Sequence, residues 1–241
     1  MKILITNDDG IQSEGIRLLA EWAKKLGDVT VAAPKTQQSA KSHAITVHNP
    51  IEIREVYFAD GVEAYAVDST PVDCVRYATL GLNRKYDLIL SGVNNGFNIG
   101  EDILYSGTVG TIFEAALRGT CGIAFSTEWN SFEPARAHLD DVYEFFVRNN
   151  LFKYNKIYNV NFPSAEYKGI RVCRQGGAYF TDEFVKVQDG LFDQQGYSVY
   201  QYGTNLELDT DATMNGYVSI TPLTVKRDDA QAFDKLKGLN K

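Results

Sequence analysis

Two adjacent carboxylates, Asp8 and Asp9, directly follow the first apolar run of the chain. That run, residues 2–6, reads KILIT and is typical of a strand buried on both faces. Neighbouring carboxylates repel each other at a partly desolvated strand end, and a hard divalent cation such as Mg²⁺ or Mn²⁺ removes that penalty. The alternative is a turn in which an aspartate side chain caps the next helix. By itself the pair fits either interpretation.

Polar side chains of suitable chemistry also follow two other expected strands. Ser39 lies in a polar loop after the second strand, and Asn95 and Asn98 lie in a later segment rich in glycine and asparagine. In open α/β sheets ligands bind at the carboxyl ends of the strands, so we expect these loops to meet at one edge. The expected metal ligands are Asp8, Asp9, Ser39 and Asn95. Their convergence from three loops favours the metal site over the turn.

A run of small residues, YSGTVG at residues 105–110, marks the start of a helix. Small side chains leave backbone N–H groups uncovered, and the helix dipole adds positive potential, so Ser106, Gly107 and Thr108 are candidates for binding a phosphate. The alternative is a simple serine or threonine N-cap. The nearby glycines do not have the spacing G-x-G-x-x-G, and no G-x-x-x-x-G-K-[ST] motif occurs, so neither a dinucleotide site nor a P-loop is supported.

Histidine offers little catalytic chemistry in this sequence. The three histidines, His43, His48 and His138, have no partner at metal-ligand spacing, and no G-x-S-x-G motif indicates a serine hydrolase. His43 follows Ser39 by four residues and so lies close enough to reach the site. We favour a structural role for it.

The elements expected along the chain alternate between strand and helix. Apolar residues recur at helical spacing over residues 14–26, and a second buried strand at residues 29–33 ends at Pro34. A strand, a helix and a strand in this order form a βαβ unit, which builds a parallel sheet. Further strands are expected at residues 44–56, 63–67, 88–90, 122–126, 158–162 and 217–220, and further helices at residues 71–82, 107–118, 135–149 and 228–236. The pattern predicts a doubly wound α/β sheet.

The composition changes over residues 168–209, which are rich in tyrosine, glutamine and glycine and have little core-forming periodicity. We interpret this segment as a β-hairpin or arm that projects from one domain spanning residues 1–241 and serves subunit contacts. Packing at a subunit interface is the favoured role of its tyrosines, and stacking on a nucleobase stays open.

The overall composition restricts the function classes. The net charge of −7 provides no basic field for nucleic acid, so no stable binding to DNA or RNA is expected. Three cysteines far apart indicate neither a disulfide framework nor a cysteine zinc site. We see no signal peptide and no apolar run long enough to span a membrane, and expect a cytoplasmic protein without membrane contacts.

Several longer stretches together resemble the SurE survival-protein family of nucleotide phosphatases. The most specific are TNDDG and SGVNNGxNxGxDxxYSGTVG; the full set of matching stretches is residues 3–16, 32–46, 68–75, 87–117 and 216–223. The resemblance implies a Rossmann-like three-layer α/β/α fold with a mainly parallel sheet. It also implies a homodimer or homotetramer built with exchanged C-terminal segments.

The resemblance extends to individual positions. Asp8, Asp9, Ser39 and Asn95 match the family's metal ligands, which implies one Mg²⁺ or Mn²⁺ ion per subunit; Ser106, Gly107 and Thr108 match its phosphate loop, with Asn98 nearby. Ala40 departs from the pattern, because many relatives have glycine there, and Thr111-Ile112 replaces a smaller pair. Neither change removes a ligand, but either one can alter the shape of the pocket. The match is weak over residues 127–210.

The expected function is therefore a phosphoric monoester hydrolase of the 5′-nucleotidase type. The substrates are nucleoside 5′-monophosphates and, as a second possibility, 3′-monophosphates, and the catalytic residues are Asp8 and Asp9. Either aspartate is also a candidate base or nucleophile. The alternatives are a non-catalytic regulator that binds nucleotide or metal on the same fold and, with less support, a glycosyltransferase-like enzyme that uses Mn²⁺.

Overall fold

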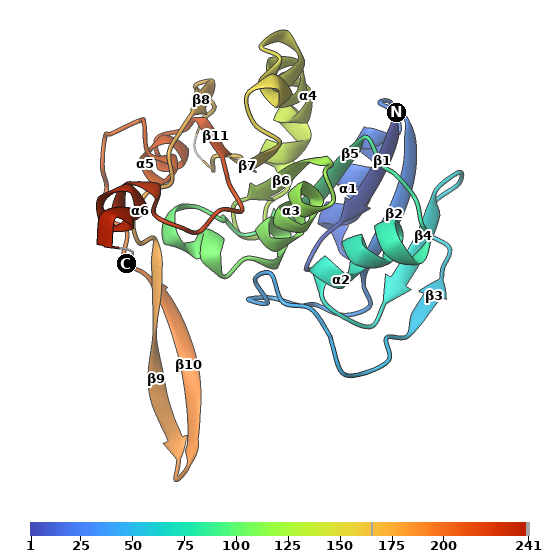
Figure 1. Ribbon diagram of the computed structural model, residues 1–241, viewed down its shortest axis with the longest axis horizontal. Coiled ribbons are helices and arrows are strands. Elements are labelled where there is room, and N and C mark those ends of the chain that lie inside the picture. Colours follow the sequence, from blue (N-terminus) through green and yellow to red (C-terminus); the bar gives the residue numbers. More distant parts are fainter. Residues whose placement is uncertain (165, 240–241) are drawn as a thin grey trace.

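A sheet of nine strands forms the centre of the protein in the computed structural model, which describes residues 1–164 and 166–239 (Figure 1). Residues 165, 240 and 241 of the expected single domain lie outside this description. In spatial order the strands are β3 (Ile53–Glu55), β4 (Glu63–Val67), β2 (Asp28–Pro34), β1 (Lys2–Thr6), β5 (Leu88–Asn95), β6 (Cys121–Thr127), β7 (Ile157–Asn161), β11 (Val218–Pro222) and β8 (Ile170–Val172).

The sheet is mainly parallel. Strands β4, β2, β1, β5, β6 and β7 are parallel to their neighbours in this run. Only two pairings within the sheet of the described residues are antiparallel, β3 with β4 and β11 with β7, while β8 is parallel to β11. The expected fold class, a mainly parallel α/β sheet with a hairpin, is confirmed.

Helices cover both faces of the sheet, which makes three layers. Helices α1 (Glu14–Ala23) and α4 (Glu133–Arg148) pack on one face, and α2 (Pro71–Arg76) and α3 (Gly107–Leu117) pack on the other. The remaining helical elements are a π-helix at Tyr77–Gly81, α5 (Asp209–Met214), α6 (Ala230–Leu236) and 3₁₀ turns at Gly100–Leu104, Leu151–Lys153 and Lys237–Leu239. No helix in the described ranges has the length and apolar character needed to cross a membrane.

Alternating side chains of β1 explain why this strand occupies the middle layer. Ile3 and Ile5 belong to the core shared with α1 and α4, whereas Leu4 belongs to the core beside α2. All three side chains are fully buried. Burial of such a side chain stabilises the fold by about 1.5–3 kcal/mol, so the run KILIT fixes both layers at once.

The order of the strands creates a crevice at the carboxyl ends of β1 and β5. From β1 the chain continues to β2 and β4 on one side, and then crosses to β5 on the other side of β1. In such sheets the loops after the two strands that flank this reversal separate and leave room for a ligand. Asp8 lies in the segment that follows β1, and Asn95 is the last residue of β5.

The predicted strand over residues 44–56 is wrong for its first part, since only Ile53–Glu55 form β3. Backbone groups near its start bond instead with side chains at the beginning of α2. The Thr46 N–H donates to Asp73 Oδ2 (2.8 Å), and Thr70 Oγ1 donates to the carbonyl of Ala44 (2.8 Å). A segment whose polar groups are satisfied by side chains does not need a sheet partner.

A two-stranded hairpin extends away from the three layers (Figure 1). Its antiparallel strands are β9 (Phe180–Gln188) and β10 (Leu191–Ser198). Within the segment predicted as an arm, residues 168–209, strand β8 instead joins the main sheet beside β11. That pairing joins residues almost fifty positions apart, and local periodicity gives no indication of it. A role of the hairpin in subunit contacts stays a prediction.

Two helix boundaries differ from expectation for local reasons. The predicted helix over residues 71–82 is α-helical only to Arg76 and continues as the π-helix. The terminal helix begins at Ala230, because Asp229 accepts a hydrogen bond from the Ala232 N–H (2.9 Å) and so acts as its N-cap. Helix α5 was not predicted.

Candidate active site

A cavity of about 1350 Å³ opens at the carboxyl edge of the sheet beside β1 and β5. Six of the eight predicted site residues line it: Asp8, Asp9, Ser39, Asn95, Asn98 and Ser106. Gly107 and Thr108 lie immediately behind Asp8, at the N-terminus of α3. The structure thus brings the predicted residues together.

Asp8 is buried against the start of α3. The Thr108 hydroxyl donates to its Oδ1 (2.6 Å), and the Thr108 backbone N–H donates to its Oδ2 (3.2 Å). Gly107 permits this approach, since a Cβ there would lie only 3.0 Å from Oδ2 of Asp8. The proton of the Thr108 hydroxyl is therefore donated to Asp8, and a direct contact between Thr108 and a phosphate stays a prediction.

The pKa values of both aspartates are raised. Burial raises the pKa of Asp8 to about 6; the hydrogen bond from Thr108 opposes this effect and the charge of Asp9 adds to it. Burial also raises the pKa of Asp9, against the hydrogen bond from the Asn95 N–H. A cation between two such carboxylates would favour their charged forms.

Asp9 is connected to the two other expected ligands. The Asn95 backbone N–H donates to its Oδ2 (3.2 Å). The Gln37 amide donates to Ser39 Oγ (3.0 Å) and lies 3.5 Å from Oδ1 of Asp9. Gln37 was not among the predicted residues. The feature of the sequence that could have identified it is its position two residues before Ser39. It links the ligands of two loops.

The loop that contains Ser39 starts next to Asp8. The Gln38 N–H donates to the carbonyl of Asp8 (2.7 Å), which fixes this end of the loop. Ala40 has a φ of 56°, a left-handed conformation that glycine adopts without a steric penalty. The alanine at this position is therefore accommodated at some conformational cost.

Asn95 and Asn98 are held by different neighbours. Asn95 Oδ1 accepts a hydrogen bond from the Asn130 N–H (2.7 Å). The Asn98 amide donates to Ser126 Oγ (2.8 Å), and its backbone N–H donates to Asn161 Oδ1 (2.9 Å). The loop after β5 is thus tied to the ends of β6 and β7.

Ser106 is the N-cap of α3, because its Oγ accepts a hydrogen bond from the Val109 N–H (3.1 Å). The capping interpretation is therefore confirmed. Ser106 also lines the cavity at the positive end of the helix dipole. Capping and anion binding are compatible here, and a phosphate contact stays a prediction.

The lining of the cavity is rich in acidic and aromatic side chains. The lining includes six carboxylate side chains, Asp8, Asp9, Glu101, Asp102, Glu128 and Asp182. No lysine, arginine or histidine of the described residues lines it. Burial raises the pKa of Asp102 to about 6, assisted by the charges of Glu101 and Asp209. An anion that enters this cavity has no basic side chain to offset its charge.

The oxygen donors of the predicted ligands suit a hard cation that also binds water or a substrate phosphate. No group of three or more His, Cys, Asp or Glu side chains placed to hold a metal occurs in residues 1–164 and 166–239. A metal at the predicted place would thus depend on two carboxylates together with hydroxyl and amide oxygens. Mg²⁺ is commonly bound by one or two carboxylates, with substrate phosphate and water as the other ligands. The residues present fit such an ion.

Comparison with known proteins gives consistent matches over nearly the whole chain. The family model described as "Survival protein SurE" matches residues 3–182. The 5′-nucleotidase SurE of Caldanaerobacter subterraneus subsp. tengcongensis is 39% identical, over 97% of this chain and 95% of that protein. The 5′-nucleotidase SurE of Alkaliphilus metalliredigens is 36% identical, over 100% and 99%. The crystal structure of the SurE protein from Aquifex aeolicus superposes with a TM-score of 0.82 at 32% identity, covering both chains completely.

Proposed function

Because this chain belongs to the SurE survival-protein family, we propose that it is a phosphatase that hydrolyses nucleoside 5′-monophosphates with a bound divalent cation. Nucleoside 3′-monophosphates are a second proposed substrate class. One observation supports the proposal above all others: Asp8, Asp9, Ser39 and Asn95 converge beside the N-terminus of α3, in a cavity that no basic side chain of residues 1–164 and 166–239 lines. Such a cavity accepts a phosphate ester only if a cation and backbone N–H groups offset its charge.

The proposed cation is one Mg²⁺ or Mn²⁺ ion per subunit, with Asp8, Asp9, Ser39 and Asn95 as its protein ligands. When bound, it supplies positive charge that offsets the charge of the phosphoryl group. The contacts to Thr108, Gln37 and Asn130 hold these side chains in position before the ion arrives. Preorganised ligands lose little conformational freedom on binding.

The chain's own groups then have separate roles. Ser106 and the positive end of the α3 dipole bind the phosphate and stabilise the charge of the transition state. Asp8 is fixed by two hydrogen bonds from Thr108. Asp9 has longer contacts and is partly exposed, so of the two it is better placed to accept a proton from the attacking water.

The nucleoside is proposed to lie in the same cavity as the phosphate. Phe97 and Tyr179 line it and are in edge contact with each other, with ring centroids 6.3 Å apart. Aromatic faces of this kind bind a base by stacking and accept several bases equally well. We further propose that the protein is a homodimer or homotetramer whose contacts include the hairpin of β9 and β10.

The test is release of inorganic phosphate from AMP and GMP by the purified protein. Release should require Mg²⁺ or Mn²⁺, stop on chelation and return when the metal is restored. Release that persists unchanged in chelator would contradict the metal requirement. Tight binding of AMP without any release would instead indicate a regulator on the same fold.

A further inference from the structure

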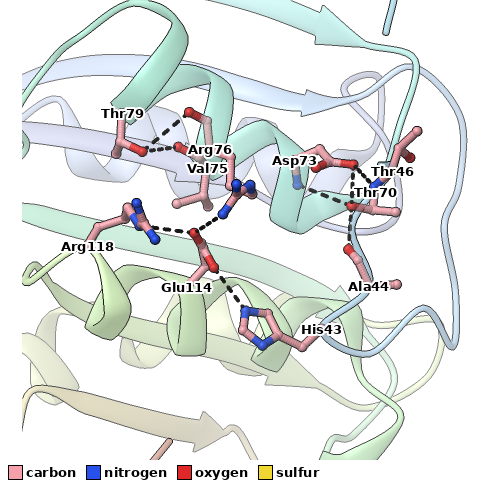
Figure 2. A network of polar contacts seen from close by, with 10 residues as sticks. All are labelled: His43, Ala44, Thr46, Thr70, Asp73, Val75, Arg76, Thr79, Glu114 and Arg118. Atoms are coloured by element: carbon pink, nitrogen blue, oxygen red, sulfur yellow. Dashed lines mark hydrogen bonds and ion pairs between the residues drawn. The ribbon is translucent and has the colours of Figure 1, made fainter. Parts of the chain in front are cut away.

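Outside the cavity, a buried carboxylate joins three side chains that the proposed reaction does not use. Glu114, on α3, is 2% exposed. Its Oε1 accepts a hydrogen bond from Arg76 of α2 (3.0 Å) and forms an ion pair with Arg118 (3.0 Å), and its Oε2 lies 3.1 Å from Nε2 of His43 (Figure 2). None of these four residues lines the cavity.

The two arginines keep Glu114 charged and leave one of its oxygens for His43. Burial alone raises the pKa of Glu114, but the hydrogen bond from His43 and the charges of Arg118 and Arg76 lower it overall. A buried carboxylate requires such partners, since an unpaired one would cost several kcal/mol. Because both arginines bind Oε1, the geometry leaves Oε2 for a ring N–H of His43.

His43 belongs to the same loop as Ser39. Near His43 this loop lies directly on α3 and on the turn before it. The Ser42 N–H donates to the carbonyl of Tyr105 (2.9 Å), and Ser42 Oγ donates to the carbonyl of Leu104 (2.7 Å). Gly110 allows the contact, since a Cβ at that position would lie 2.2 Å from the Ser42 carbonyl oxygen.

Ser39 therefore lies between two parts of the loop whose positions are fixed by hydrogen bonds. On one side the Gln38 N–H is bonded to the carbonyl of Asp8 (2.7 Å), and on the other side Ser42 and His43 are bonded to α3 and its preceding turn. The span between these points is exposed, and Ala40 and Ser42 both have left-handed backbones, with φ of 56° and 50°. The side chain of Ser39 accepts a hydrogen bond from the Gln37 amide (3.0 Å), whereas the backbone of this span is fixed at its two ends.

We propose that His43, held by Glu114, is a positioning residue that fixes the Ser39 loop and so sets the distance of the Ser39 hydroxyl from Asp8 and Asp9. The inference rests on the proposed function, because it assigns Ser39 to the cation site. Arg76 and Arg118 act one step further away, by keeping Glu114 charged and in place. Groups behind a metal ligand commonly change metal affinity by about 10- to 100-fold when they are removed.

The decisive variants are His43→Ala and His43→Gln. Alanine removes the donor to Glu114, whereas the amide nitrogen of glutamine is able to replace Nε2 of histidine as a donor. The matched control is His138→Ala, because His138 also pairs with a carboxylate, Asp141, at 3.0 Å. The side chains of His43 and His138 are similarly exposed, 25% and 22%, and His138 lies on α4, outside the cavity.

The measurements are Mn²⁺ affinity without substrate, by calorimetry, and the rate of trypsin cleavage after Lys41, which lies between Ser39 and His43. We expect His43→Ala to weaken Mn²⁺ binding about tenfold or more and to speed cleavage at Lys41. His43→Gln should restore both within about threefold, and His138→Ala should change neither. Circular dichroism at the assay temperature verifies that each variant is folded.

The inference is overturned if folded His43→Ala binds Mn²⁺ as wild type does, whether or not Lys41 becomes easier to cleave. It is also overturned if His43→Gln fails to restore affinity, because the hydrogen bond to Glu114 is then not the cause. A wild-type protein that binds no Mn²⁺ contradicts the proposed function instead. In that case, the rate of trypsin cleavage after Lys41 alone tests whether His43 positions the loop.

Discussion

The Thr108 hydroxyl and the Asp8 carboxylate, one hundred residues apart in the chain, are joined by a hydrogen bond of 2.6 Å. This bond connects the end of the central strand to the first turn of α3. It places the carboxylate at the positive end of a helix dipole, where negative charge is favoured. The position of a proposed metal ligand thus depends on a residue in the first turn of the proposed phosphate-binding helix.

Replacement of Thr108 by valine should therefore impair the metal site while keeping the size of the side chain. A hydrogen bond to a charged group contributes about 1.5–3 kcal/mol, so we expect a loss of roughly 10- to 100-fold in Mn²⁺ affinity. Calorimetric titration of the apoprotein measures this loss. Thr108→Ser keeps the hydroxyl and serves as the control; an equal loss in both variants would show that the bond to Asp8 is not responsible.

Replacement of Asp9 by asparagine should abolish metal-dependent release of phosphate, by about 100-fold or more, with little change in thermal stability. The variant loses one of the two carboxylate charges proposed to bind the cation and the group proposed to accept a proton. Steady-state assays with AMP at saturating Mg²⁺ measure the effect. The control is Asp228→Asn, an exposed carboxylate outside the cavity. Turnover of Asp9→Asn at the wild-type rate would show that the site is wrongly assigned.

The acidic lining of the cavity should discriminate against substrates that bring several negative charges. We expect AMP to be hydrolysed with a higher kcat/KM than inorganic tripolyphosphate, by about tenfold or more, because the part of the chain that the structure describes places no basic side chain in the cavity lining. Asp102→Asn should raise the rate for tripolyphosphate more than the rate for AMP. Since burial and nearby carboxylates raise the pKa of Asp102 to about 6, wild-type discrimination should also weaken below that pH. Equal effects of the variant on both substrates would contradict this account.

Asp209 should make stability depend on pH. Burial raises its pKa from 3.8 to about 6, despite hydrogen bonds from the N–H groups of Gly176, Gly100 and Thr210. The folded state therefore binds the proton more tightly than the unfolded state, so this group's contribution falls as pH rises from about 4 to about 6. The loss is at most about 3 kcal/mol. Urea unfolding of wild type and Asp209→Asn at pH 4.5 and 7 tests this. Wild type should lose stability relative to the variant at the higher pH, and a constant difference would refute the expectation.

The sequence alone predicted the parts of the site that follow from strand order. Asp8, Asp9 and Asn95 come directly after or at the end of apolar strands, and the carboxyl ends of parallel strands share one edge. The two-faced burial of β1 is likewise visible in five consecutive residues. These inferences needed only local patterns and one rule about sheets.

The contacts that support the site depend on distant pairings and were not predictable. Gln37 bridges Asp9 and Ser39 only because the loop folds back onto the end of β1. The contact of His43 with Glu114 spans 71 positions and requires the packing of the loop on α3. His43 was expected to be structural, and nothing in its neighbourhood in the sequence identifies Glu114 as its partner. The same limitation applies to β8, whose partner strand lies beyond the hairpin.

Asp209 has a practical consequence for protein engineering. Its carboxylate accepts hydrogen bonds from Gly100, in the loop after β5, and from Gly176, at the base of the hairpin. A shortened protein without the hairpin must therefore retain Gly176. The ends to be joined are Tyr179 and Val199, whose backbones already meet in a hydrogen bond of 3.0 Å. A short turn spliced there removes both strands, and with them Phe180, Thr181, Asp182 and Gln194 of the cavity lining, but keeps the contacts of Asp209 that anchor the loop after β5.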